Sequence, residues 1–133
     1  MSSKAEQAFS TKLKNHLLKT KPEYSMAIEV KVVAKGSRFA FSDIRKGQWA
    51  TLLKLSEGIP VAHKISDGSA GSKLVDLLYL NPDAVRLIPM VAIKFSESKK
   101  SYLVDFNDIK KLKVQYGFKS TDEGYLQPYL IKM

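Results

Sequence analysis

AIEVKVVAKGSRFAFSDIRKGQWATLL, from Ala27 to Leu53, is the stretch that decides the fold of this chain. It opens with an apolar, β-branched run that ends at Val33 and is typical of a buried strand. Side chains alternate across a strand, so Glu29 and Lys31 emerge on one face while their apolar neighbours pack on the other. A carboxylate and an ammonium in so apolar a strand are costly to desolvate unless they are paired or bind an ion.

The second half of this stretch predicts a helix from Ser42 to Leu55. Either Ser42 or Asp43 can cap this helix, and its apolar residues recur near the 3.6-residue period. Gln48 falls in the first two turns. Trp49 lies on the apolar stripe, so we expect it in the core.

Three features of this stretch together resemble the core of the PD-(D/E)XK nuclease superfamily, and in particular Holliday-junction resolvases and phage-encoded nucleases. They are the triplet Glu29-Val30-Lys31, the segment Phe39-Ala40-Phe41 and the helix that carries Gln48. The resemblance implies a restriction-endonuclease-like core in which Glu29 binds Mg²⁺ or Mn²⁺. It also implies that Lys31 positions or activates the attacking water and that Gln48 orients the site.

The second metal-binding acid departs from the family pattern. The family places an aspartate one hairpin before E-x-K, but no aspartate precedes Glu29 in this chain. Glu23 is one substitute. Alternatively, the strand order is permuted and a later acid, Asp67 or Asp76, is brought beside Glu29. We favour Asp76, because it is the one acid in the apolar, strand-like segment 73–80 and a buried aspartate needs a partner.

The N-terminal segment predicts a helix that starts after Ser2 or Ser3 and runs to about Lys19. Its apolar side chains recur at i, i+4 on one face, at Ala5, Phe9, Leu13 and Leu17. Glu6 lies in the first turn and has two interpretations. A carboxylate there is favoured by the helix macrodipole, whereas the resemblance implies an acid that reaches the metal site.

Composition narrows the class of partner. The chain has 22 Lys+Arg against 13 Asp+Glu, a net charge of +9, which favours a polyanion such as DNA. The absence of cysteine excludes disulfides, zinc fingers and thiol nucleophiles. The sequence shows neither a signal peptide nor an apolar run of the roughly 20 residues that span a bilayer. We therefore expect a cytoplasmic protein of a bacterium or its phage, with no membrane partner.

Four basic residues are the predicted DNA contacts. Lys35 and Arg38 form a basic turn after the central strand, next to the expected metal site. Lys64 and Lys73 begin K-I-x-D and K-x-x-D segments, whose order after the glutamine helix resembles that of phage nuclease-like proteins. Such residues bind phosphates, which supplies affinity and salt dependence but no sequence specificity.

The remaining chain predicts further strands. Residues 85–95 and 101–106 read as a β-hairpin, with Pro89 at an edge or a bulge. A short basic helix or turn follows, starting at Asn107 or Asp108. The extension 114–133 has three interpretations: an extra strand, a dimerisation segment, or a segment ordered by a partner. The whole predicts one α+β domain, 1–133, with a mixed sheet flanked by helices.

The resemblance thus implies a small metal-dependent endonuclease that hydrolyses phosphodiester bonds in duplex or branched DNA, as a Holliday-junction resolvase does in DNA recombination. A homodimer is expected, because a junction presents two symmetric cut sites. Two alternatives stay open. One is a catalytically incomplete nuclease fold that only binds DNA, and the other is a basic phage interaction protein.

Overall fold

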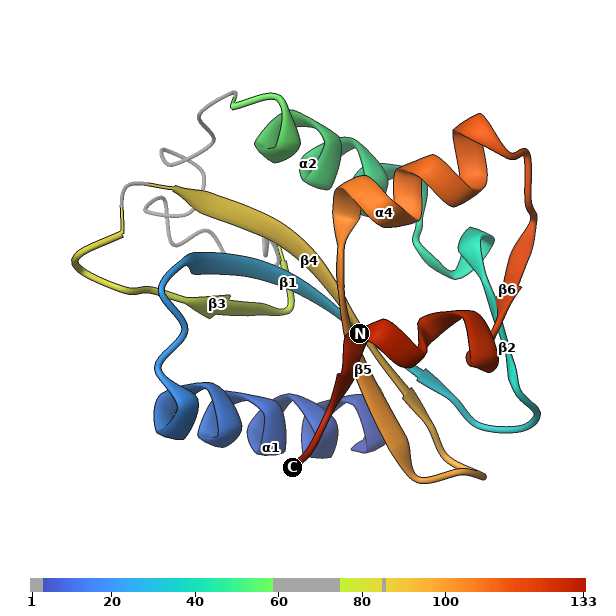
Figure 1. Ribbon diagram of the computed structural model, residues 1–133, viewed down its shortest axis with the longest axis horizontal. Helices are drawn as coiled ribbons and strands as arrows, with labels where there is room; N and C mark the ends of the chain where they lie inside the picture. The colour runs from blue at the N-terminus through green and yellow to red at the C-terminus, as the bar shows by residue number, and fades with distance from the viewer. Residues whose placement is uncertain (1–3, 59–74, 85) are drawn as a thin grey trace.

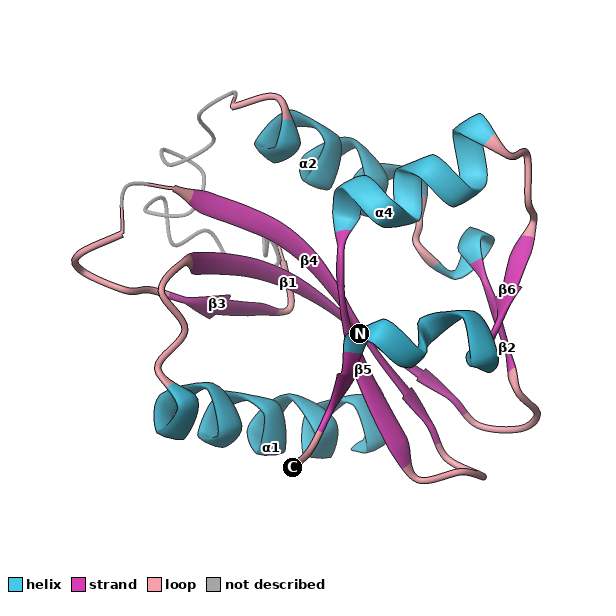
Figure 2. Cartoon of the chain, viewed as in Figure 1, coloured by secondary structure: helices cyan, strands magenta, loops and turns pink. Residues whose placement is uncertain are grey.

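The computed structural model describes residues 4–58, 75–84 and 86–133 (Figure 1). Helices and short 3-10 or π-helical turns alternate with strands, and Figure 2 separates the two classes by colour. The elements are α1 (Lys4–Thr20), β1 (Ser25–Val33), β2 (Arg38–Ala40), a 3-10 turn (Phe41–Asp43), α2 (Lys46–Ser56), β3 (Leu77–Tyr79), β4 (Leu87–Phe95), β5 (Lys100–Asp105), α4 (Phe106–Lys110), a π-helical turn (Lys111–Gln115), β6 (Ser120–Asp122), a 3-10 helix (Glu123–Tyr129) and β7 (Leu130–Ile131).

A mixed sheet forms the centre of the molecule. In the part of the chain that the structure describes, its five strands run in the order β3-β1-β4-β5-β7. β1 pairs in parallel with β4 over nine residues and antiparallel with β3, while β4 and β5 form an antiparallel hairpin. A second, two-stranded sheet joins β2 to β6. The α+β class, with a mixed sheet flanked by helices, is therefore confirmed.

Helices cover both faces of the sheet, as Figure 1 shows with α1 on one side and α2 and α4 on the other. Phe9, Leu13 and Leu17 of α1 pack against Ile28 and Val30 of β1 in one hydrophobic core. The second core lies on the opposite face and is larger. It contains Phe39, Phe41, Leu52, Val91, Ile93, Phe95, Tyr102, Val104, Phe106 and Ile109.

The first helix and the hairpin agree with the sequence. α1 begins and ends within one or two residues of the predicted bounds, and the β4–β5 hairpin is confirmed. Pro89 also lies at a local edge, because β5 pairs with β4 only from Met90 onwards and Pro89 has a strand partner only in β1. Ala5 is exposed, so the buried stripe begins one turn later, at Phe9.

The start of the glutamine helix also differs from the prediction. Residues 41–43 form a 3-10 turn, and α2 begins only at Lys46 with Arg45 as its N-cap, so neither Ser42 nor Asp43 caps it. The reason is burial: Phe41 and Ile44 point into the larger core, and the short turn between them serves that packing. Trp49 is half-buried at the margin of this core. Its ring lies 4.8 Å from that of Phe106.

The C-terminal extension packs as extra strands, one of the three interpretations left open above. β6 pairs with β2, and β7 adds to the edge of the main sheet beside β5. The hydroxyl of Tyr102 donates a hydrogen bond of 2.7 Å to Glu123, which ties the extension to β5. Among the helices of residues 4–58, 75–84 and 86–133, none has the length and apolarity to cross a membrane.

Candidate active site

Two acids meet on the β1–β3 side of the sheet. Glu29 lies on β1 and is only 1% exposed. Leu77, the first residue of β3, pairs with Ile28, so Asp76 lies just before this strand on the side of Glu29. The backbone amide of Val30 donates a 2.9 Å hydrogen bond to Asp76 Oδ2 and fixes this carboxyl group against β1. The placement predicted for Asp76 by a permuted strand order is therefore observed.

The environment of Glu29 opposes its ionisation. Burial, then the charge of Asp76 and a hydrogen bond between the two carboxyl groups, raises the pKa of Glu29 from 4.5 to about 8. Lys31 lowers this pKa, and the charge of Glu6 raises it. Glu29 Oε2 is buried and has no hydrogen-bond partner among the residues that the structure describes. A buried acceptor without a partner is uncommon and costly, so this oxygen is available to a ligand.

Lys31 lies on the same face of β1 as Glu29. A side chain of α2 holds its ammonium group in place. The ammonium group donates a 3.0 Å hydrogen bond to Gln48 Oε1. The same oxygen accepts a 3.0 Å hydrogen bond from the backbone amide of Arg45, which satisfies one free amide at the start of α2. Gln48 therefore fixes Lys31 and caps α2 with one atom. The structure thus brings together Glu29, Lys31, Gln48 and Asp76, as the sequence predicts.

Two further acids were candidate ligands. Glu6, on α1, acts on the pKa of Glu29 through its charge, and its role as a metal ligand stays a prediction. Glu23 is exposed in the connection before β1. Within residues 4–58, 75–84 and 86–133, no three His, Cys, Asp or Glu side chains are close enough to hold a metal together. The alternative acid Asp67 lies outside the described residues.

The four predicted DNA contacts have different surroundings. Lys35 is exposed in the turn after β1, beside Gly36, whose φ of 82° is a conformation that glycine adopts without strain. Arg38 donates two hydrogen bonds to Ser120 Oγ and lies 3.9 Å from the Asp122 carboxylate, so it also joins β2 to β6. Lys64 and Lys73 lie outside the described residues.

Two backbone groups of the site were not anticipated from the sequence. They are the amide of Val30, which anchors Asp76, and the amide of Arg45, which anchors Gln48. A glutamine three residues after the N-cap is half of a capping box, so this second contact had a signal. The capping box is hard to recognise in the sequence, because its N-cap residue is Arg45 and not serine, threonine or aspartate.

Comparison with other proteins adds no family. No protein-family model, no curated protein and no solved structure matches this chain significantly.

Proposed function

We propose that this protein is a metal-dependent DNA endonuclease of the PD-(D/E)XK type, selective for branched DNA as Holliday-junction resolvases are. It would act in the bacterial cytoplasm and be encoded by a bacterium or its phage. The observation that carries the proposal is the contact between the buried Glu29 carboxyl group and the half-buried Asp76, with Lys31 two residues beyond Glu29 on the same strand. Paired acids at the surface are common, but a buried acid beside a second acid is unfavourable without a cation.

The residues at this site fit a divalent cation. Mg²⁺ is usually held by one or two carboxylates, with water and substrate phosphate completing its shell. Glu29 and Asp76 would supply these carboxylates, including the Oε2 atom that has no partner among the described residues. When bound, such an ion polarises the phosphate and lowers the pKa of a bound water.

Lys31 adds a positive charge from the protein to the charge that the metal ion would bring. Its ammonium is held by Gln48 on one side and keeps two N–H groups for other acceptors. At this position Lys31 would orient the attacking water or stabilise the charge that develops on the phosphate. The exposed Lys35, in the turn after β1, would hold the backbone of the substrate.

The alternative of a catalytically incomplete DNA-binding fold would be favoured by a Glu29 without a second acid. Asp76 lies beside Glu29, which favours the enzyme over that alternative. A homodimer, expected for a resolvase acting on a two-fold symmetric junction, belongs to the same proposal.

Cleavage of labelled four-way-junction, duplex and single-stranded DNA tests the proposal, with Mg²⁺, Mn²⁺ or EDTA. Glu29→Ala and Lys31→Ala are compared with the wild type, and Glu97→Ala and Lys54→Ala serve as controls because both side chains are exposed. We expect nicking that needs metal, persists in both controls and disappears in both site variants. Salt-sensitive binding without cleavage under either metal would leave only the DNA-binding alternative. Binding that does not weaken with added salt would favour the remaining alternative, a basic phage protein that interacts with another protein.

A further inference from the structure

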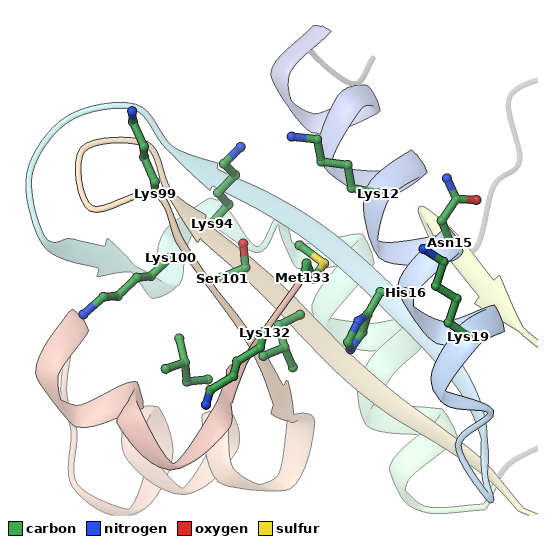
Figure 3. Close-up of a pocket in the computed structure, with 12 residues that line it drawn as sticks. Lys12, Asn15, His16, Lys19, Lys94, Lys99, Lys100, Ser101, Lys132 and Met133 are labelled. Atoms are coloured by element: carbon green, nitrogen blue, oxygen red, sulfur yellow. The ribbon is translucent and has the colours of Figure 1, made fainter.

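A groove of about 740 Å³ lies between α1 and the C-terminal strand, on the far side of the sheet from Glu29. Figure 3 shows α1 as one wall, with the β4–β5 hairpin and the last residues of the chain forming the other. We call it the lysine groove, because six lysines line it: Lys12, Lys19, Lys94, Lys99, Lys100 and Lys132. Among its described lining residues, none is acidic.

The topology explains why lysines far apart in sequence meet here. Lys94 pairs with Val32 of β1 and Ser101 of β5, and Ser101 pairs in turn with Ile131 of β7. These paired residues form a row across the sheet, which α1 covers at the β1 end and β7 extends at the opposite edge. The middle of the row, on β4 and β5, forms the floor of the lysine groove. Lys94 stands on that floor and is half-buried.

The charge of the lysine groove is not neutralised within the described chain. In residues 4–58, 75–84 and 86–133 the one ion pair joins Arg38 to Asp122, so none of the six lysines has a carboxylate partner. Six cations around one hollow raise the local concentration of anions.

The lysine groove and the candidate active site lie on opposite faces of the sheet. Lys31 pairs with Ile93, whose side chain belongs to the larger core, whereas the next residue, Lys94, points to the α1 face. A phosphate bound in the lysine groove therefore cannot be the phosphate positioned by Lys31. The two places must contact different parts of a polyanion.

We propose that the lysine groove binds the sugar–phosphate backbone of a second DNA segment, separate from the segment that reaches Glu29 and Lys31. A branched DNA offers such a segment in its neighbouring arm. The proposal rests on DNA being the substrate, as proposed above. It adds the place where the second arm is held and a physical reason for preferring branched over linear DNA.

The shape of the lysine groove favours nucleic acid over an anionic membrane. A membrane-binding surface presents apolar side chains to the bilayer with basic residues around them. Here a single lining apolar side chain, Met133, is exposed at 52%, whereas Leu130 and Ile131 are half-buried and lysines occupy both walls. Exposed lysines along both sides of a groove fit a ridge of closely spaced phosphates, and neutralising each phosphate releases counterions.

A matched pair of triple variants tests this proposal. The groove variant carries Lys12→Gln, Lys19→Gln and Lys132→Gln, three exposed lysines from both walls. The control variant carries Lys14→Gln, Lys54→Gln and Lys119→Gln, three exposed lysines outside the groove, and loses the same charge. Circular dichroism and thermal melting check that both are folded. A single Lys94→Gln variant probes the floor.

The readout is fluorescence anisotropy with a labelled four-way junction and a linear duplex, in EDTA so that cleavage is not needed. We expect the groove variant to bind the junction about tenfold more weakly, with a smaller loss on linear duplex. Its salt slope should fall by about two to three, since each lost phosphate contact contributes about 0.9. The control should stay within about twofold of the wild type, because the charge it loses lies outside the groove.

Equal losses in the groove and control variants would overturn the proposal, because net charge alone would then explain binding. Unchanged DNA affinity, with lost binding to phosphatidylserine vesicles or to inorganic tripolyphosphate, would overturn it in favour of a membrane or a small phosphate ligand. The two proposals fail separately. A wild type that never cleaves, with a selective loss in the groove variant, removes the nuclease and keeps the groove. Metal-dependent cleavage by the wild type, together with normal junction binding by the groove variant, would keep the nuclease and remove the groove proposal.

Discussion

The ammonium group of Lys31 donates a 3.0 Å hydrogen bond to the side-chain oxygen of Gln48, which joins β1 to the first turn of α2. The contact fixes the position of a charged group that would otherwise be mobile on its four-carbon stem. It also makes the geometry of Lys31 depend on where α2 begins, because the same oxygen accepts from the amide of Arg45.

Two substitutions of Gln48 distinguish its contact with Lys31 from its capping of α2. Gln48→Ala should lower the free energy of unfolding by about 1 kcal/mol, since the amide of Arg45 and the ammonium of Lys31 both lose a partner. Gln48→Glu should keep the stability, because glutamate also caps from this position. It should still reduce cleavage, because the carboxylate neutralises Lys31. Urea unfolding and junction cleavage measure the two effects, and wild-type stability of Gln48→Ala would contradict the capping role.

Glu29→Gln should stabilise the metal-free protein in a pH-dependent way. Below pH 4.5 both folded and unfolded Glu29 are protonated, so the variant gains little. Between pH 4.5 and about 8 the folded state keeps a proton that the unfolded state releases, so the wild type loses stability as pH rises. The advantage of the variant should grow over this window to about 5 kcal/mol and then level off.

Thermal melting in EDTA at pH 5, 7 and 9 measures this advantage. Glu97→Gln is the matched control, because Glu97 is exposed in the hairpin turn and should show no such trend. An advantage that is constant with pH would contradict the raised pKa of Glu29.

Mg²⁺ should stabilise the wild type more at pH 8.5 than at pH 6.5. The ion binds the ionised carboxylate, and the proton held by Glu29 must leave first, so affinity rises as pH approaches about 8. Asp76→Asn should abolish this stabilisation, although its side-chain oxygen can still accept from Val30 and preserve the fold. The shift in melting temperature with added Mg²⁺ is the measurement. An equal shift in Asp76→Asn would place the ion elsewhere.

Two leucines of α1 test the smaller core. Leu13 is fully buried against β1, so Leu13→Ala should cost about 3 kcal/mol through lost burial and the cavity that remains. Leu18 lies on the same helix but is 55% exposed, and Leu18→Ala should cost less than about 0.5 kcal/mol. Denaturant titration compares them, and similar costs would mean that α1 is not packed as described.

Local patterns in the sequence predicted the parts of the site that depend on one strand. Alternation along β1 placed Glu29 and Lys31 on one face, and the apolar surroundings of Asp76 indicated that it needed a buried partner. The start of α2 was missed because the packing of Phe41 and Ile44 outweighs the capping preference of Ser42 and Asp43. The meeting of lysines from α1, β4 and the end of the chain follows from tertiary contacts, which no local pattern contains.

The parallel pairing of β1 with β4 has a consequence for how the molecule folds. It joins residues around position 29 to residues around position 91, so a long stretch of chain must close before these contacts form. The β4–β5 hairpin has only a short connection and can form early. We expect pulsed hydrogen exchange during refolding to protect β5 before β1, which makes the strand that carries Glu29 one of the last to gain its neighbours.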